Sequence, residues 1–131
     1  MIEAKTRMTL RLDFGETVRI GPGKVRLLEL IAELGSISAA GRAMSMSYRR
    51  AWLLVDSLNQ AFVEPVVATR PGGKADKRAE LTAFGRQVVD RFRDMEATAW
   101  KAIARDVHAL EHAIKADPAI PMMHDPELAP I

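Results

Sequence analysis

The 131-residue sequence contains no cysteine. Disulfide bonds and thiolate metal sites are therefore excluded, and the composition suits a reducing compartment. The sequence also lacks any run of ~18 apolar residues, the length that a membrane span requires. Its first twelve residues alternate in character and lack the continuous apolar stretch of a secretory signal. Together these absences predict a cytoplasmic protein that does not enter a membrane.

Signatures of common enzyme sites are absent as well. Gly21-Pro22-Gly23 does not extend to the G-x-G-x-x-G fingerprint, and we find neither a P-loop nor a Ser/His/Asp arrangement. Residues 108–112 match the H-x-x-E-H pattern of some zinc peptidases, but a catalytic zinc needs a third protein ligand. The remaining histidine, His124, lies in a Pro-rich tail. We therefore expect no enzymatic activity, no cofactor and no metal, with His108 and His112 solvated near a helix C-terminus.

The composition is typical of a globular protein, with 48% hydrophobic and 27% charged residues. The net charge is only +2, but its distribution is uneven. Residues 36–78 carry seven basic and three acidic side chains, whereas residues 79–131 carry six basic and nine acidic ones. A basic block of this kind points toward a polyanionic partner, although an ordinary solvated surface has the same composition.

The N-terminal third predicts one strand and one helix. Met8–Phe14 alternates apolar and polar residues, which is typical of a half-buried strand with Phe14 on the apolar face. Apolar residues at helical spacing predict a helix over Lys24–Leu34. Pro22 is well placed to open this helix, and Gly35 to end it with a left-handed cap.

The next segment predicts a helix-turn-helix. Ser36 is the expected N-cap of a short helix, Ile37–Ala43, in which Gly41 permits close contact with a neighbouring helix. After a break of about three residues, Ser47 can cap a third helix that runs from Tyr48 to Phe62. The face of this helix that we expect in the core carries Ala51, Leu54, Val55, Leu58 and Phe62.

A hairpin and a long helix follow. Val66–Arg70 and Ala79–Leu81 are predicted strands around a Gly-rich charged loop, so they form a wing. Thr82 is the expected cap of a helix that reaches Lys115, about 50 Å at ~1.5 Å per residue. Its apolar stripe is longer than a domain of this size can cover, which predicts a homodimer. The predicted dimer contacts are Val88, Phe92, Met95, Trp100, Ile103, Val107 and Leu110.

The predicted fold is therefore mainly α with a small β wing: a winged helix-turn-helix with a long C-terminal dimerisation helix. We divide the chain into a DNA-binding domain (1–81), the dimerisation helix (82–116) and a Pro-rich disordered tail (117–131).

Double-stranded DNA is the polyanion that such a fold would bind. Arginine at the start of a recognition helix can bind guanine with two hydrogen bonds, and basic residues on a wing can contact phosphates. Trp52 is expected to pack against the domain or the dimer partner rather than to stack on DNA, and Tyr48 fits either role. The predicted DNA contacts are Ser36, Ser38, Arg42, Ser47, Tyr48, Arg49, Arg50, Arg70, Lys74, Lys77 and Arg78.

Four segments, 35–41, 46–52, 69–74 and 81–85, resemble the N-terminal DNA-binding domain of the molybdate-dependent transcriptional regulators of the ModE family, which is related to the winged helix of LysR-type regulators. The resemblance implies a dimer that binds palindromic operators, and it suggests a role in molybdenum metabolism. Full-length members carry a C-terminal molybdate-binding region of small β-barrel domains. No strand-rich segment follows Lys115, so we do not expect this chain alone to bind molybdate.

The sequence thus predicts a sequence-specific transcriptional regulator that acts as a homodimer on a pseudo-palindromic operator. The alternative is a protein-interaction module that uses the winged helix only as a dimerisation scaffold. The basic surface of the third helix and the wing favours the regulator, since a pure interaction module has no need of it.

Overall fold

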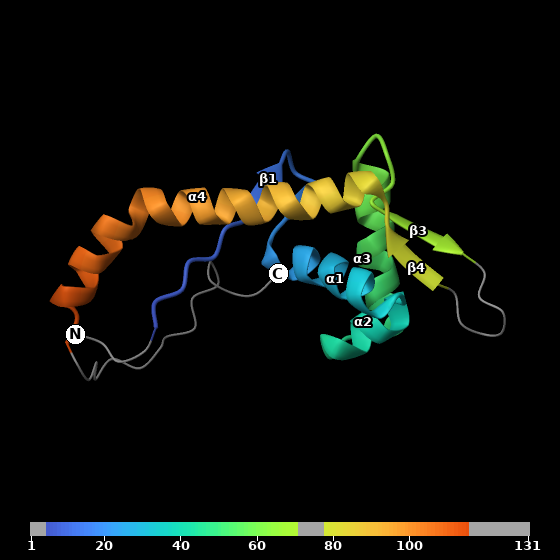
Figure 1. Cartoon of the computed structure of the whole chain (residues 1–131), viewed down its shortest axis with the longest axis horizontal. Coiled ribbons are helices and arrows are strands. Elements are labelled where there is room, and N and C mark those ends of the chain that lie inside the picture. Colours follow the sequence, from blue (N-terminus) through green and yellow to red (C-terminus); the bar gives the residue numbers. More distant parts are fainter. Residues whose placement is uncertain (1–4, 71–77, 116–131) are drawn as a thin grey trace.

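Helices dominate the part of the chain that the computed structural model describes, residues 5–70 and 78–115. The elements in chain order are β1 (Leu12–Phe14), β2 (Val18–Ile20), α1 (Pro22–Leu34), α2 (Ile37–Ala43), α3 (Tyr48–Ala61), β3 (Val67–Arg70), β4 (Arg78–Leu81) and α4 (Ala83–Ala113). Figure 1 shows α1, α2, α3 and the β3–β4 hairpin clustered at one end of α4, which projects away from them. This arrangement confirms the predicted fold class, a winged helix-turn-helix with a long C-terminal helix. The predicted wing loop and Pro-rich tail lie outside the described residues.

The helix ends follow the capping rules that the sequence indicated. Pro22 occupies the first turn of α1, and Gly35 ends that helix in the left-handed region with φ at 71°. Ser36, Ser47 and Thr82 each precede a helix, and each side-chain oxygen accepts a hydrogen bond from the backbone N–H three residues later. Local sequence therefore sets where α2, α3 and α4 begin.

The core lies between α1 and the elements around it. Val25, Leu27, Leu28 and Ile31 of α1 are fully buried, and they share one cluster with side chains of α2, α3, the hairpin and the first turns of α4. Phe92 of α4 is 1% exposed and belongs to this cluster. Its predicted place in the dimer stripe is therefore wrong, because the side chain is already covered by its own domain.

Two glycines allow backbones to approach closely. A Cβ built on Gly41 would lie 2.9 Å from the Cβ of Ala51, which confirms the predicted close contact between α2 and α3. A Cβ built on Gly85 would lie 2.0 Å from the carbonyl oxygen of Val66. The sequence did not indicate this second contact, which brings the first turn of α4 directly against the start of the hairpin.

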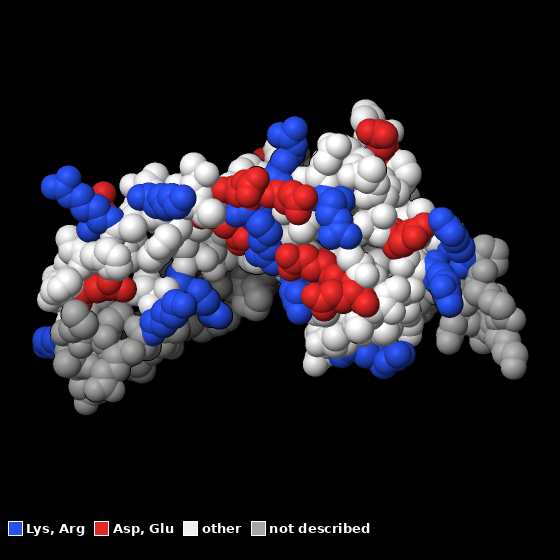
Figure 2. Space-filling model, in the orientation of Figure 1, with Lys and Arg blue, Asp and Glu red and all other residues white. Residues whose placement is uncertain are grey.

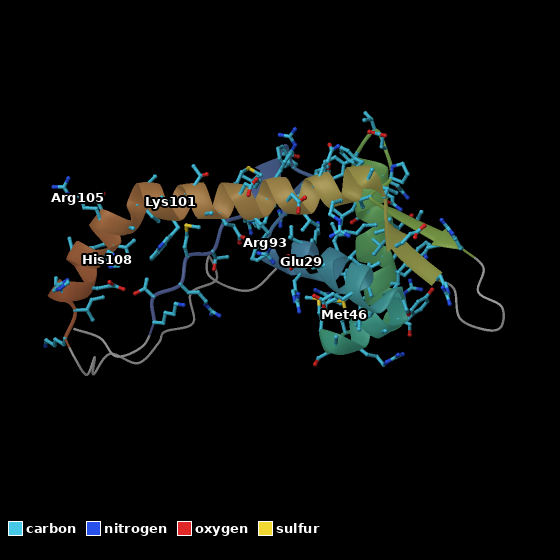
Figure 3. All side chains as sticks on the ribbon, viewed as in Figure 1. Glu29, Met46, Arg93, Lys101, Arg105 and His108 are labelled. Atoms are coloured by element: carbon cyan, nitrogen blue, oxygen red, sulfur yellow. The ribbon has the colours of Figure 1, made fainter. Side chains whose placement is uncertain are left out.

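A charged side chain also ties α4 to α1. The Arg93 guanidinium donates to both carboxylate oxygens of Glu29, at 2.8 and 3.1 Å, and to Glu96 at 2.7 Å. Figure 3 shows Glu29 and Arg93 side by side between the two helices. The hydrogen bonds from Arg93 hold the pKa of Glu29 below its ordinary value.

The predicted strand over Met8–Phe14 is wrong in length. Only Leu12–Phe14 forms a strand, paired with Val18–Ile20, a strand that was not predicted. Residues 5–11 form neither helix nor strand, and Figure 1 shows this segment running beside α4. Met8 lines an open hollow together with Ala97 and Trp100 of α4, and residues 5–11 alternate between exposed and half-buried, so the alternating pattern reflects an extended segment with one side toward a helix. Phe14, expected on the apolar face, is exposed.

The 31-residue helix α4 is fully buried at residues of its first third only. Gly85, Val89 and Phe92 are its buried residues, and none of the residues from 93 to 113 is buried to that degree. Charged residues recur along its length, and no helix in the described ranges is long and apolar enough to cross a membrane. Residues 5–8 lie along one side of the outer two thirds of α4, where the Thr6 hydroxyl donates to Glu111, and the described part of the chain leaves the other sides open.

We predict that Gly85→Ala destabilises the fold by about 1–3 kcal/mol or more, because the added methyl meets backbone rather than a movable side chain. Gly23→Ala in α1 is the matched control, since its Cβ would meet nothing within 4 Å. The control should gain ~0.4–1 kcal/mol from reduced backbone entropy. Urea unfolding of both variants checks this, and equal stability of the two would contradict the contact with Val66.

We also predict an acid-dependent loss of stability from Glu29. A carboxylate whose folded pKa is lowered stabilises the fold above its unfolded pKa of about 4.5, and the contribution disappears as the pH falls through the folded pKa. Glu29→Gln should therefore lower the urea midpoint at pH 6 but have a smaller effect near pH 3. An equal effect of the substitution at both pH values would contradict the role of the Arg93 ion pair.

Candidate nucleic-acid interface

A hydrogen-bonded turn orients α3 relative to α2. Ser45 adopts the left-handed region with φ at 57°. The N–H of Met46 donates to the carbonyl of Gly41 at 2.9 Å, and the N–H of Ser45 donates to Arg42 at 3.0 Å. The chain therefore reverses within three residues, and the start of α3 emerges at the surface beside the end of α2.

Helix α3 has two distinct faces. Ala51, Val55 and Leu58 are buried against the domain, as the sequence predicted, while Leu54 and Phe62 are partly buried at its edge. The N-terminal end of the helix, Ser47 to Arg50, is exposed at every residue. The helix dipole makes such an end favourable for anions. The structure thus presents hydroxyl, phenol and guanidinium groups together on a rigidly held helix start.

Helix α2 adds a second polar pair beside this end. The Arg42 guanidinium donates to the Ser38 hydroxyl at 2.8 Å, and both groups lie at the surface. The Ser36 oxygen is engaged as the cap of α2, as the Ser47 oxygen is for α3. Each of these serine hydroxyls also carries a proton that it can donate to a phosphate oxygen.

The hairpin places two further arginines opposite each other. Arg70 and Arg78 form the last pair in the β3–β4 register, next to the loop that joins the strands. Arg70 also forms a 2.7 Å ion pair with Glu80, which offsets part of the positive charge there. Lys74 and Lys77, predicted to contact DNA, lie outside the described residues. Figure 2 shows basic side chains at the hairpin end and at the lower edge near α2, whereas acidic and basic ones are mixed in the middle of this face.

Asn59 is a positioning residue that the sequence analysis missed. Its side-chain oxygen accepts hydrogen bonds from the N–H groups of Val66 at 2.8 Å and Val67 at 3.1 Å, and its amide donates to the carbonyl of Val67 at 3.1 Å. The last turn of α3 is thereby joined to the first residues of the hairpin. A lone Asn in a helix gives no signal for this, because its partners are defined only by the tertiary fold.

The histidines of the H-x-x-E-H segment make local contacts near the end of α4. His108 Nδ1 lies 2.7 Å from a carboxylate oxygen of Glu111, and His112 Nδ1 lies 2.7 Å from the carbonyl of His108. Within residues 5–70 and 78–115, no group of three or more His, Cys, Asp or Glu side chains could hold a metal ion. The described side chains near this segment therefore lack the ligand set of a zinc peptidase.

No protein-family model matches the chain. Individual proteins do match it. The molybdenum-pterin-binding protein MopB of Rhodobacter capsulatus is 38% identical over 101 residues, which are 77% of this chain and 36% of MopB. The molybdenum transport protein ModE of Azotobacter vinelandii is 34% identical over 99 residues, 76% of this chain and 36% of that protein.

A further match is the DNA-binding transcriptional dual regulator ModE of Escherichia coli (strain K12), 30% identical over 91 residues, which are 70% of this chain and 34% of that regulator. The chain thus spans about a third of the length of the relatives it matches. By its sequence, the chain matches proteins of the ModE family, and its winged helix-turn-helix fold is the one that the resemblance to their N-terminal domain implies.

Proposed function

We propose that this chain is a sequence-specific DNA-binding transcriptional regulator that acts as a homodimer on a pseudo-palindromic operator. The observation that carries the proposal is the exposed start of α3, Ser47 to Arg50, held by a buried face on the same helix. A recognition helix requires this division, because base edges must be contacted by side chains whose backbone does not move.

In this proposal α3 enters the major groove, with Arg49 and Arg50 directed at base edges. Ser36, Ser38 and Arg42 of α2 contact the phosphates that border the groove. Arg70 and Arg78 of the hairpin, with Lys74 and Lys77 of the predicted wing loop, contact phosphates or the minor groove. The phosphate contacts position the protein, and the contacts of α3 select the sequence.

The homodimer is proposed to form along the outer part of α4. Met95, Ile103 and Leu110 are exposed large apolar side chains spaced at seven or eight residues, and Leu110 is 66% exposed. Trp100 and Val107 are half-buried beside this stripe, with Trp100 near Met8, and Val88 lies at its inner end, partly packed against the core. An apolar stripe that continues beyond its own domain favours a second helix of the same kind. We accordingly assign DNA binding to residues 1–81 and dimerisation to residues 82–116.

A symmetric dimer would place two copies of α3 on successive major grooves, about 34 Å apart. The names of the relatives, a molybdenum transport protein and a DNA-binding transcriptional dual regulator, support a role in molybdenum-related gene regulation. The competing function is a protein-interaction module on the same scaffold, which predicts no preference among DNA sequences.

Selection from a randomised duplex library at about 0.15 M salt tests the proposal, with enrichment of an inverted repeat as the expected result. On the enriched duplex, Arg49→Ala/Arg50→Ala should weaken binding at least ~30-fold, since each bidentate contact contributes about 1 kcal/mol or more. Lys101→Ala/Arg105→Ala is the charge-matched control, because both residues are exposed on the outer part of α4 (Figure 3). Equal affinity of the Arg49/Arg50 variant and the wild type would refute the assignment of α3.

Ile103→Glu/Leu110→Glu tests the dimer. These substitutions should raise the dimer dissociation constant at least ~100-fold, because a buried Leu or Ile contributes ~1.5 kcal/mol or more to association. Ala102→Glu/Ala109→Glu is the control, since it adds the same charge at exposed positions beside the stripe. Sedimentation equilibrium distinguishes the two variants. A wild type that is monomeric at micromolar concentration would contradict the proposal directly.

A further inference from the structure

The second turn of α3 carries two large apolar side chains that the domain does not cover. Trp52 is 44% exposed and Leu53 is 46% exposed. Neither belongs to the core cluster or to the partly buried residues that pack against it. Trp52 was expected to pack on the domain or the dimer partner, but it is exposed on α3, away from the outer part of α4, and the described residues leave nearly half of its surface open.

The helix period places these side chains in line with the exposed start of α3. Leu53 follows Arg49 by four residues, and Trp52 follows Tyr48 by four, so each pair shares one side of the helix. At 100° per residue, Arg49 and Leu53 lie opposite the stripe that contains Val55 and Leu58. Leu53 therefore lies on the same outward side of α3 as Arg49, about 6 Å further along the helix axis.

The major groove offers one apolar group to such a face. Guanine, cytosine and adenine present hydrogen-bonding atoms there, and thymine adds a 5-methyl group. A leucine set against a polar base edge would leave that edge without a hydrogen-bond partner, whereas leucine against a methyl buries apolar surface on both sides. A displacement of about 6 Å corresponds to one or two base pairs at ~3.4 Å each.

We propose that Leu53, with Trp52 beside it, contacts the 5-methyl groups of thymines one or two base pairs from the pair that Arg49 contacts. Leu53 is then a specificity-determining residue, and each operator half-site contains thymine at that position. The inference rests on the proposed function, because it requires α3 to lie in the major groove.

Charge favours DNA over a second copy of the chain as the occupant of this patch. Along α3 the two apolar side chains follow Arg49 and Arg50, and Asp56 comes three residues after Leu53, so positive charge predominates on this face. A symmetric contact between two copies of this surface would bring like charges together, whereas the phosphates along a groove are of opposite charge.

The test uses the full chain and the duplex that it selects from a randomised library. Each thymine of the half-site is replaced in turn by deoxyuridine, which removes only the 5-methyl group. Loss of one methyl contact should weaken wild-type binding about fourfold, or about 15-fold when both half-sites are changed. Leu53→Ala should bind the thymine duplex more weakly and no longer distinguish it from the deoxyuridine duplex. Its salt dependence should match the wild type, because an apolar contact releases no counterions.

Leu34→Ala is the matched control, since Leu34 is an equally exposed leucine (48%) on α1, and it should discriminate as the wild type does. If Leu53→Ala still binds the thymine duplex more tightly than the deoxyuridine duplex, the methyl groups act through DNA shape, and the inference is overturned. So would a wild type that is indifferent to deoxyuridine at every thymine, a result that needs no protein variant. A library without any enriched repeat would instead overturn the proposed function, and this inference with it.

Discussion

The contact between Gly85 and Val66 is the constraint on which the rest of the structure depends. At this corner the Thr82 hydroxyl accepts from the Gly85 N–H and donates to the carbonyl of Pro65, while the Thr82 N–H donates to the carbonyl of Val66. Asn59 binds the neighbouring backbone from the end of α3. Three elements, α3, the β3–β4 hairpin and α4, therefore meet within a few residues. Because a side chain at position 85 cannot fit, their relative orientation has little freedom.

This rigidity matters for the proposed function, because the two proposed surfaces lie on different parts of the molecule. The start of α3 is separated from the outer part of α4, as Figure 1 shows. The spacing of two recognition helices in a dimer is then set by the angle between α4 and the domain. The contact between Gly85 and Val66 fixes the start of α4 against the hairpin, and the ion pair of Arg93 with Glu29 fixes α4 against α1.

The relatives match the chain over about a third of their own length. Their names differ, from molybdenum-pterin binding to molybdenum transport and transcriptional regulation, and these names describe proteins about three times as long as the matched region. What they share with the chain is a stretch of 91–101 residues, most of its length. The exposed cationic start of α3 and the apolar pair that follows it are accordingly the features through which we expect this module to select DNA.

The sequence by itself determined the local structure of this protein. Pro22, Gly35 and the serine and threonine caps defined the helix boundaries, because capping depends on neighbours within four residues. The apolar spacing of α3 likewise indicated which of its sides is buried. The tertiary structure decided what depends on distant residues: that residues 8–11 lie along α4 instead of in a sheet, that Phe92 fills the core, and that Gly85 and Asn59 join three elements at Val66. Periodicity shows that a face is apolar, but only the fold shows which surface covers it.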